Sequence, residues 1–578
     1  MSDEHPIARR DPIVLGCGFL AICIAVVGLG MQRLELPGLN YDEVIQAEPA
    51  RQFLRVNGRP SEIPGIESGR WLGRWFPLMT QPYMGALKSQ SLIPIFAAFG
   101  ATATSLRLTT LAWGLLGLLL AMLWARRVLG LPAALLAGAL LAFDPSFFFV
   151  SRHDWGSVTL ALICRCGGLY FAFSGWTGRS GIRLFIAGLL LGLGLYNKID
   201  FGIFLAAAGV GLGLAASAAT RRALISPRRG LPIVLGFALG ATPMAIALNG
   251  AVRASRAVMQ RRGGAATDWS EKLHALETTL DGSYFHRLIL SGGSFEEMFD
   301  VETAASGPFL WIFLASVVFL AVRCRMQWRR DPVENDARAV LFVLVTTVLS
   351  LAGMLLMPGA ERIHHVLNAY PFPHFTVAIA VIELWRLGGP GGLSGPGGER
   401  ARLAHASRTG ALLRGTAVVV AAIALTGGLS VSLRTLDTIW ETGGRGRWSD
   451  ALTRFAIDLE NRPRAVVVSL DWGLDGPIRF TAPDHRFIEP IWKLQKAHRR
   501  AEDWRHNGTA QHEYLLYEKP FALFDFGASF QDAIRSLPPG SVTIERHLDR
   551  RGDPVFLSVR FRGPHRLIYR RGFEIHLR

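Results

Sequence analysis

Polar side chains that could move a proton or bind a phosphate collect on one side of the apolar segments of this chain. Phosphate groups are bound well by Lys and Arg, and an acceptor hydroxyl needs a carboxylate base within hydrogen-bond reach. The loops on the other side contain almost only arginine. The mixed set comprises Asp42, Glu43, Lys88, Asp144, Arg152, His153, Asp154, Lys198, Asp200, Arg362, His364 and His365.

The acidic pair Asp42 and Glu43 follows the first apolar segment, 12–31. Carboxylates beside a bilayer core are costly and usually have a functional or pairing reason. In the functional interpretation, Asp42 is a general base and Glu43 orients the site. In the structural alternative, the pair begins an amphipathic helix that runs to about residue 57, where an acidic first turn suits the helix dipole.

The arginines and Asp144 also have structural alternatives. Arg107, early in a predicted span, could only extend its side chain toward the interface. Asp144 precedes a proline and could end a helix. Arg152 and Asp154 could pair with each other.

The later motifs leave similar alternatives open. Lys198 and Asp200 could form an ion pair at the interface. The adjacent His364 and His365 could be a plain loop pair, since neighbouring histidines are a weak metal signal. Their occurrence on the same face as the acids and lysines favours a shared site.

The elements that must position these residues are predicted membrane helices. Half of the 578 residues are hydrophobic, and a helix needs about 20 apolar residues to span a bilayer. The segment 84–99 carries Lys88 and Pro94 and is expected to be re-entrant or interfacial. About eleven spans are expected, near 12–31, 105–124, 131–149, 156–174, 183–197, 200–218, 231–248, 307–322, 339–357, 369–386 and 411–431.

The placement of arginine predicts the orientation of the chain. Every alternate loop is basic, which indicates a cytoplasmic N-terminus and an extracytoplasmic C-terminal part. The formal net charge of +17 could suggest a nucleic-acid partner. Because much of the arginine lies in short loops between spans, we expect contact with membrane lipids and no nucleic acid.

The predicted fold is mostly α, a polytopic helical bundle over 1–435 with a small α/β extracytoplasmic domain over 436–578. The bundle has long outer loops at 32–104 and 249–306 and a Gly/Pro-rich cytoplasmic linker at 387–410. In the C-terminal part, residues 465–470 read AVVVSL and predict a buried strand. The segments 511–526 and 542–559 supply further candidates.

Several motifs occur in a fixed order. They are Asn40 to Glu43 with Arg51, Pro82 to Lys88, Phe99 to Leu108, Phe143 to Ser146, Gly194 to Lys198, and Arg362 to His365 with Tyr370-Pro371. Together they resemble the polyprenyl-phosphate-dependent GT-C glycosyltransferases, and the protein O-mannosyltransferases and lipid A aminoarabinose transferases in particular. The resemblance covers about 1–390 and, in outline, the C-terminal domain. One departure is Ile45, where the aminoarabinose transferases have an arginine.

The resemblance implies an inverting transfer of a sugar from an undecaprenyl- or dolichyl-like phosphate to a lipid, glycan or protein acceptor. Asp42 corresponds to the family's base, and Lys88 and Lys198 correspond to its phosphate contacts. The proposed transfer takes place at the outer face of a membrane and needs no cofactor, although some relatives use a divalent metal. The scarcity of lysine, six residues against 56 arginines, suggests a GC-rich bacterial genome and therefore the bacterial inner membrane. The remaining substrate-binding candidates are Arg51, Arg107, Arg152, Asp154, Arg362, His364 and His365.

A non-enzymatic transporter or lipid flippase is the alternative from another functional class. Transporters often show inverted repeats and charged residues at mid-membrane. This sequence has no detectable internal repeat, and its charges cluster at one face. A scaffold that lost its activity would have no need to keep Asp42, Lys88 and Lys198, so the sequence favours the enzyme.

Overall fold

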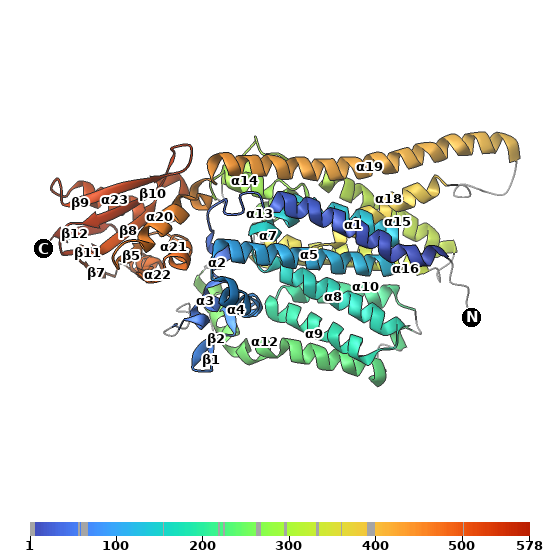
Figure 1. Ribbon diagram of the computed structural model, residues 1–578, viewed down its shortest axis with the longest axis horizontal. Coiled ribbons are helices and arrows are strands. Elements are labelled where there is room, and N and C mark those ends of the chain that lie inside the picture. The colour runs from blue at the N-terminus through green and yellow to red at the C-terminus, as the bar shows by residue number, and fades with distance from the viewer. Residues whose placement is uncertain are drawn as a thin grey trace.

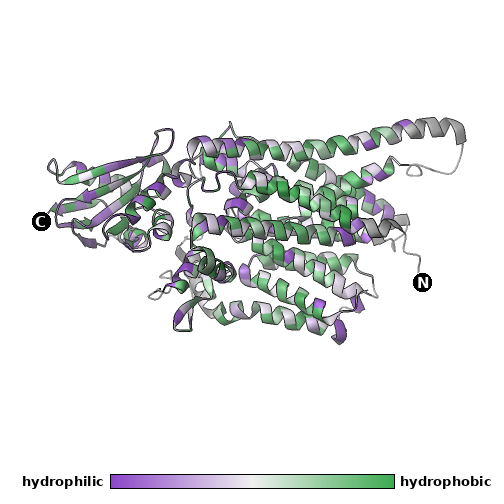
Figure 2. Cartoon of the chain, viewed as in Figure 1, coloured by the Kyte–Doolittle hydropathy of each residue, from purple (hydrophilic) through white to green (hydrophobic). Residues whose placement is uncertain are grey.

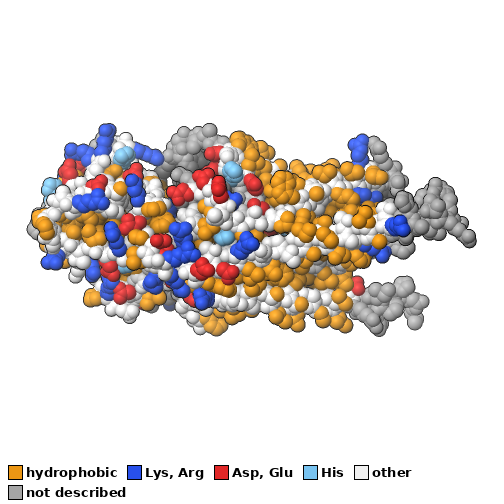
Figure 3. All heavy atoms as spheres, turned by 90° about the horizontal axis from the view of Figure 1, so that it is seen from above, with side chains coloured by type: hydrophobic (Ala, Val, Ile, Leu, Met, Phe, Trp, Pro, Cys, Tyr) orange, Lys and Arg blue, Asp and Glu red, His pale blue; other side chains and the backbone are white. Residues whose placement is uncertain are grey.

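The structure is a computed structural model of a helical bundle with a C-terminal domain at one end of its long axis (Figure 1). The N-terminus lies at the opposite end. Hydrophobic residues predominate along the bundle helices (Figure 2). On the face that Figure 3 shows, charged side chains concentrate over the C-terminal domain and its junction with the bundle. The described residues are 6–55, 58, 68–153, 155–217, 220–222, 226–261, 268–293, 297–330, 335–359, 361–389, 399–500 and 502–577.

Each of the expected spans coincides with helical structure. In the described part of the chain, seven helices are long and apolar enough to cross a membrane, and the bent pair α6–α7 makes an eighth. The chain is therefore an integral membrane protein. The bundle helices are α1 (Pro6–Gly30), α5 (Ala103–Val128), α6 (Leu131–Ala142), α7 (Pro145–His153), α8 (Val158–Thr177), α9 (Gly181–Asn197), α10 (Phe201–Ala215), α12 (Pro227–Arg261), α15 (Phe309–Arg330), α16 (Asn335–Leu356), α18 (Phe372–Leu387) and α19 (Glu399–Thr442).

Two features of the sequence explain how these helices meet. Asp144 and Pro145 separate α6 from α7, which bend by 62°, and the Asp144 carboxylate accepts a hydrogen bond from the backbone N–H of Phe147. The expected end of a helix at Asp144 is thus confirmed. Gly188 and Gly192 let α9 approach α12 closely, because a Cβ there would lie 2.0 and 2.3 Å from carbonyl oxygens of α12.

The loop between α1 and α5 is folded rather than extended. It contains α2 (Tyr41–Val44), α3 (Glu48–Leu54), β1 (Ser68–Trp71), β2 (Arg74–Pro77), β3 (Met79–Gln81), β4 (Met84–Gly85) and α4 (Leu87–Phe99). The prediction of a single helix from Asp42 to about residue 57 is wrong, because this stretch forms two short helices. Pro49 lies in the first turn of the second helix, α3, where a missing N–H costs nothing. Lys88 lies in the first turn of α4.

The remaining loops at this end of the bundle add further short helices. They are α13 (Trp269–Leu280), α14 (Tyr284–Leu290), η1 (Glu297–Asp300), α17 (Ile363–Val366) and η2 (Leu367–Ala369). Residues 390–398 of the expected linker at 387–410 lie outside the described residues, and α19 begins directly after them at Glu399.

The C-terminal domain is built on two sheets. A five-stranded sheet has the order β6-β5-β8-β10-β9, and a three-stranded sheet has the order β12-β11-β7. The strand expected at 465–470 is confirmed as β5, which pairs in parallel with β6 and β8. The expected domain boundary at 435/436 lies inside α19.

The elements of this domain follow α19 in chain order. They are η3 (Gly446–Trp448), α20 (Ala451–Glu460), β5 (Val466–Ser469), α21 (Asp475–Thr481), β6 (Arg486–Ile488), α22 (Ile491–Arg500), β7 (Trp504–Gly508), β8 (His512–Tyr517), η4 (Lys519–Phe521), α23 (Phe526–Arg535), β9 (Val542–Leu548), β10 (Pro554–Phe561), β11 (His565–Tyr569) and β12 (Phe573–Leu577).

The distribution of arginine yields a topological prediction. We expect a reporter fused after Arg578 to indicate an extracytoplasmic location, because the basic loops should remain in the cytoplasm. A fusion after Leu129, beside Arg126 and Arg127 at the other end of α5, is the matched control and should indicate the cytoplasm. A cytoplasmic signal from the Arg578 fusion would contradict the orientation.

Candidate functional site

The carboxylate of Asp42 is held in place by a short, well-capped helix. Asn40 precedes α2, and its side-chain oxygen accepts a hydrogen bond from the backbone N–H of Asp42 at 2.9 Å. The Glu43 carboxylate accepts one from the backbone N–H of Asn40 at 2.9 Å, which completes a capping box. Asn40 is therefore the cap, and the Asp42 side chain is not used for capping.

Glu43 forms a buried ion pair with Arg107 on α5. Two hydrogen bonds of 2.9 Å join the guanidinium to the two carboxylate oxygens, and both side chains are almost fully buried. The other N–H groups of Arg107 donate to the carbonyl oxygens of Leu34, Pro37 and Gly38. All five donors of this guanidinium are thus used. The expectation that Arg107 contacts a lipid phosphate is not supported, and neither is the alternative that it extends to the interface.

Arg152 holds the neighbouring part of the same loop. It is fully buried, and one N–H group lies 2.8 Å from Nε2 of His153. Its other donors bind the carbonyl oxygens of Gly30, Gln32, Arg33 and Leu36. Like Arg107, it has no donor left for a phosphate. The two arginines fix the backbone of 30–38, the segment that leads from α1 to Asp42.

Asp42 itself lies among cationic side chains. Burial raises the pKa of its carboxyl to about 6, while hydrogen bonding by Trp155 and the charges of Lys88, Arg362 and Lys198 oppose the shift. The three cations come from α4, the end of α9 and the segment before α17, and Trp155 lies between α7 and α8. The structure therefore brings Asp42, Lys88, Lys198 and Arg362 together, as the sequence predicts.

Lys198 is paired within this group. Its ammonium lies 2.8 Å from a carboxylate oxygen of Asp200, and Nδ1 of His365 lies 3.1 Å from the same oxygen. Both Lys198 and Asp200 are buried. The alternative of an ion pair is therefore confirmed, although the pair lies inside the protein. Burial and the Lys198 charge lower the pKa of His365 to about 4, so this imidazole is neutral at pH 7.

His364 contributes shape rather than charge. Burial lowers the pKa of its imidazole well below the usual value, and the ring packs against the backbone of Gly156, where a Cβ would lie 2.7 Å from that of His364. Gly156 has a φ of +81°, which favours glycine. Within the described residues, no group of three or more His, Cys, Asp or Glu side chains is arranged to hold a metal ion. Transfer without a metal stays a prediction.

Arg51, another candidate, contacts the C-terminal domain. Arg51 donates two hydrogen bonds, of 2.8 and 2.6 Å, to Glu48, and its guanidinium lies 5.8 Å from the ring centroid of Phe480 in the C-terminal domain. It therefore joins the two domains at this point. Asp154 lies outside the described residues.

Two aromatic residues also belong to this site, although neither is among the residues predicted above. Trp155 is almost fully buried beside Asp42, and Tyr284 packs edge-on against it with centroids 6.1 Å apart. Trp155 directly follows the motif that ends at Asp154, so extending the motif by one residue would have included it. Tyr284 carried no signal, because it lies on a short helix in a long outer loop.

The C-terminal domain reaches the same site. The rings of Tyr41 and Trp472 lie 4.4 Å apart between centroids, and a Cβ on Gly476 would lie 3.1 Å from the Tyr41 ring. Since Tyr41 directly precedes Asp42, the loop after β5 borders the site. The C-terminal domain therefore lies beside the short helix that carries Asp42.

The chain is similar to several proteins of known structure. Among solved structures, the chain is similar to ArnT from Cupriavidus metallidurans bound to undecaprenyl phosphate, with 13% identity and a TM-score of 0.48 over 95% of this chain and 98% of that chain. It is also similar to the Archaeoglobus fulgidus oligosaccharyltransferase tethered with an acceptor peptide, with 13% identity and a TM-score of 0.47 over 82% and 63%. No curated protein matches.

Residues 89–246 match the family model described as dolichyl-phosphate-mannose-protein mannosyltransferase. This stretch runs from α4 into α12 and contains Arg107, Arg152, Trp155 and Lys198. The resemblance to the glycosyltransferases that use a polyprenyl-phosphate sugar is therefore confirmed over residues 89–246.

Proposed function

We propose that this protein is a membrane glycosyltransferase that moves a sugar from a polyprenyl-phosphate carrier to an acceptor at the outer membrane face. The observation that carries the proposal is a carboxylate, Asp42, with a raised pKa beside three cationic side chains. The family match over residues 89–246 supports the same class of donor. A base next to a phosphate-binding group of cations is what transfer from a glycosyl phosphate requires.

In the proposed reaction, Asp42 accepts the proton of an acceptor hydroxyl as its oxygen attacks the anomeric carbon. The new glycosidic C–O bond forms while the bond from that carbon to the phosphate oxygen breaks, and the electron pair of the breaking bond stays on the phosphate. Attack from the opposite side inverts the anomeric configuration. Lys88, Lys198 and Arg362 offset the charge that develops on the leaving phosphate.

The other buried charges have positioning roles in this proposal. Glu43 is engaged by Arg107 and by the backbone of Asn40, so it orients α2 rather than taking the proton. Arg107 and Arg152 hold 30–38 in place. A misplacement of about 1 Å in such a site can cost on the order of 10² in rate, so a rigid support for Asp42 has a direct kinetic value.

Cleavage of the donor is the experiment that tests this function. Purified protein in liposomes is given a polyprenyl-phosphate sugar labelled in the sugar, together with an envelope fraction of the source cells as acceptor. We expect free polyprenyl phosphate and labelled acceptor. A transporter or flippase would leave the donor uncleaved, and the labelled donor would only move to the opposite leaflet. That result would reject the proposal.

The cations around Asp42 yield a prediction about donor binding. We expect Lys88→Ala and Lys198→Ala each to weaken binding of polyprenyl phosphate, measured by a competition assay in detergent, by about tenfold or more, since a hydrogen bond to a charged group contributes about 1.5–3 kcal/mol. The matched control is Lys493→Ala, an exposed lysine of α22. Unchanged binding by both site variants would show that these lysines do not hold the phosphate.

A further inference from the structure

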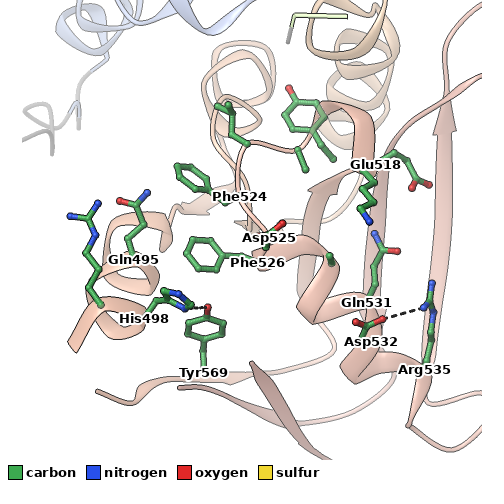
Figure 4. A pocket seen from close by; sticks show the side chains of 16 residues that line it. Gln495, His498, Glu518, Phe524, Asp525, Phe526, Gln531, Asp532, Arg535 and Tyr569 are labelled. Carbon is green, nitrogen blue, oxygen red and sulfur yellow. Dashed lines mark hydrogen bonds and ion pairs between the residues drawn. The ribbon is translucent and has the colours of Figure 1, made fainter. Parts of the chain in front are cut away.

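The C-terminal domain contains a groove that lies outside the site around Asp42. Its volume is about 590 Å³, within the range of small-molecule and cofactor pockets. The walls come from α22, from the end of β8 with the segment that follows it, from α23 and from the end of β11. Figure 4 shows the side chains that line it.

Aromatic rings form one part of the lining. Phe524 and Phe526 lie 5.6 Å apart between centroids with nearly parallel planes, and Phe526 meets Tyr569 edge-on at 5.3 Å. The Tyr569 hydroxyl lies 3.0 Å from Nδ1 of His498 (Figure 4). Phe524 is only partly buried, so its ring is open to a ligand.

Polar groups of both hydrogen-bonding kinds surround these rings. Gln495 and Gln531 offer amides that donate and accept. Asp525 and Glu518 add acceptors, and Lys519 adds donors. A pyranose ring presents C–H groups on its faces, which suit the negative face of an aromatic ring, and hydroxyls at its edge, which both donate and accept. The lining thus suits a sugar chain better than a purely apolar ligand.

An extended peptide has less to bind here. Peptides are commonly held by adding a strand to an exposed sheet edge. The two strands that reach the groove are β8, which lies between β5 and β10, and β11, which lies between β12 and β7. Among the described residues both are paired on each side, so a peptide would find no free strand edge in the groove.

The groove is connected to the site by a short series of contacts. The backbone N–H of Leu523, in the groove lining, donates to the Asp471 carboxylate at 3.1 Å. That carboxylate also accepts from the backbone N–H of Trp472 at 2.7 Å. The Trp472 ring packs on Tyr41, which directly precedes Asp42.

We propose that this groove binds a carbohydrate chain, with the Phe524 ring, which packs on the buried Phe526, as the stacking surface and Gln495 and Gln531 as hydrogen-bonding groups. The groove holds part of a glycan acceptor whose reacting hydroxyl reaches Asp42. This role as acceptor site rests on the proposed function, whereas the binding of carbohydrate does not.

The test measures binding by the full-length protein in nanodiscs, without any transfer step. The probes are hexasaccharides of glucose and of N-acetylglucosamine, and a nonapeptide of mixed sequence serves as the competing class. We expect at least one hexasaccharide to bind. Phe524→Ala and Gln531→Ala should each weaken that binding about 2- to 10-fold, the range of one aromatic contact or hydrogen bond.

The control variant is Trp492→Ala. Trp492 is an exposed aromatic on α22 that does not line the groove, and its removal should leave binding unchanged. A thermal unfolding scan checks that each variant is folded. Three results would each overturn the proposal: neither hexasaccharide binds, the Phe524→Ala and Gln531→Ala variants bind as well as the wild-type protein, or the peptide binds instead. Absence of donor cleavage by the wild-type protein would reject the proposed function and would leave this binding measurement unaffected, so the two proposals fail separately.

Discussion

Replacing Asp42 by Asn should lower sugar transfer by on the order of 10² or more while the protein stays folded and membrane-inserted. Asn keeps the size and shape of the side chain but cannot accept the proton of the acceptor hydroxyl. The helix should persist, because Asn40 provides its cap and the Asp42 side chain does not. The measurement is transfer from a polyprenyl-phosphate sugar in liposomes, with thermal unfolding of the same preparation.

Two further variants sharpen this result. Asp437→Asn changes an exposed carboxylate on α19 and should transfer normally. Glu43→Gln should lower transfer per folded molecule less than Asp42→Asn does, because Glu43 is paired with Arg107. Near-normal transfer by Asp42→Asn would remove Asp42 as the base and leave Asp154 or Glu43 as the next candidate. Unfolding of that variant would instead favour a purely structural role in α2.

The second large effect is expected for Arg107→Ala. This substitution leaves Glu43 as an unpaired buried carboxylate and removes the donors from three backbone carbonyls. Breaking a buried pair by removing one partner costs about 3–5 kcal/mol. We therefore expect a clear fall in thermal stability in detergent, together with loss of transfer because α2 loses its support.

The matched control lies on the same helix. Arg126, at the other end of α5, is partly exposed, so Arg126→Ala should change stability by about 0.5 kcal/mol or less. The double variant Glu43→Leu with Arg107→Met removes both charges and should recover only part of the stability, because the carbonyls of 30–38 still lack donors. Full stability of Arg107→Ala would contradict the role given to this arginine.

The membrane helices could be predicted from the sequence because length and apolar composition decide them. Every expected span is helical, even where α9, α10 and α18 are short, with 17, 15 and 16 residues. The periodic pattern after Asp42 predicted one helix, whereas Pro49 is a local signal for the start of a second helix.

The partners of the charged residues could be predicted only in part. Lys88 and Lys198 lie near Asp42 as expected, since Lys88 lies at the start of an apolar helix and Lys198 at the end of another. Arg107 and Arg152 are also cationic and lie at the same end of the bundle, yet both donate their hydrogen bonds to carbonyl oxygens of 30–38. Which acceptor an arginine binds depends on how that loop folds, and no spacing in the sequence encodes it.

The contact between the domains was beyond sequence reasoning for the same reason. Tyr41 and Trp472 are separated by more than 400 residues, and nothing in either motif indicates that they pack together. Asp471 follows the predicted strand 465–470, and nothing in the sequence indicates that its carboxylate joins the backbone of Trp472 to that of Leu523.

The pH dependence of transfer tests the role of Asp42 most directly. Because burial raises the pKa of its carboxyl to about 6, the base is ionised above that pH and protonated below it. We predict that transfer by the wild-type protein falls as the pH decreases through about 6. Since burial raises the pKa of Asp471 to about 7, Asp471→Asn is measured alongside and should keep the fall near pH 6. The low residual transfer of Asp42→Asn should lack it, and the same fall in that variant would contradict Asp42 as the base.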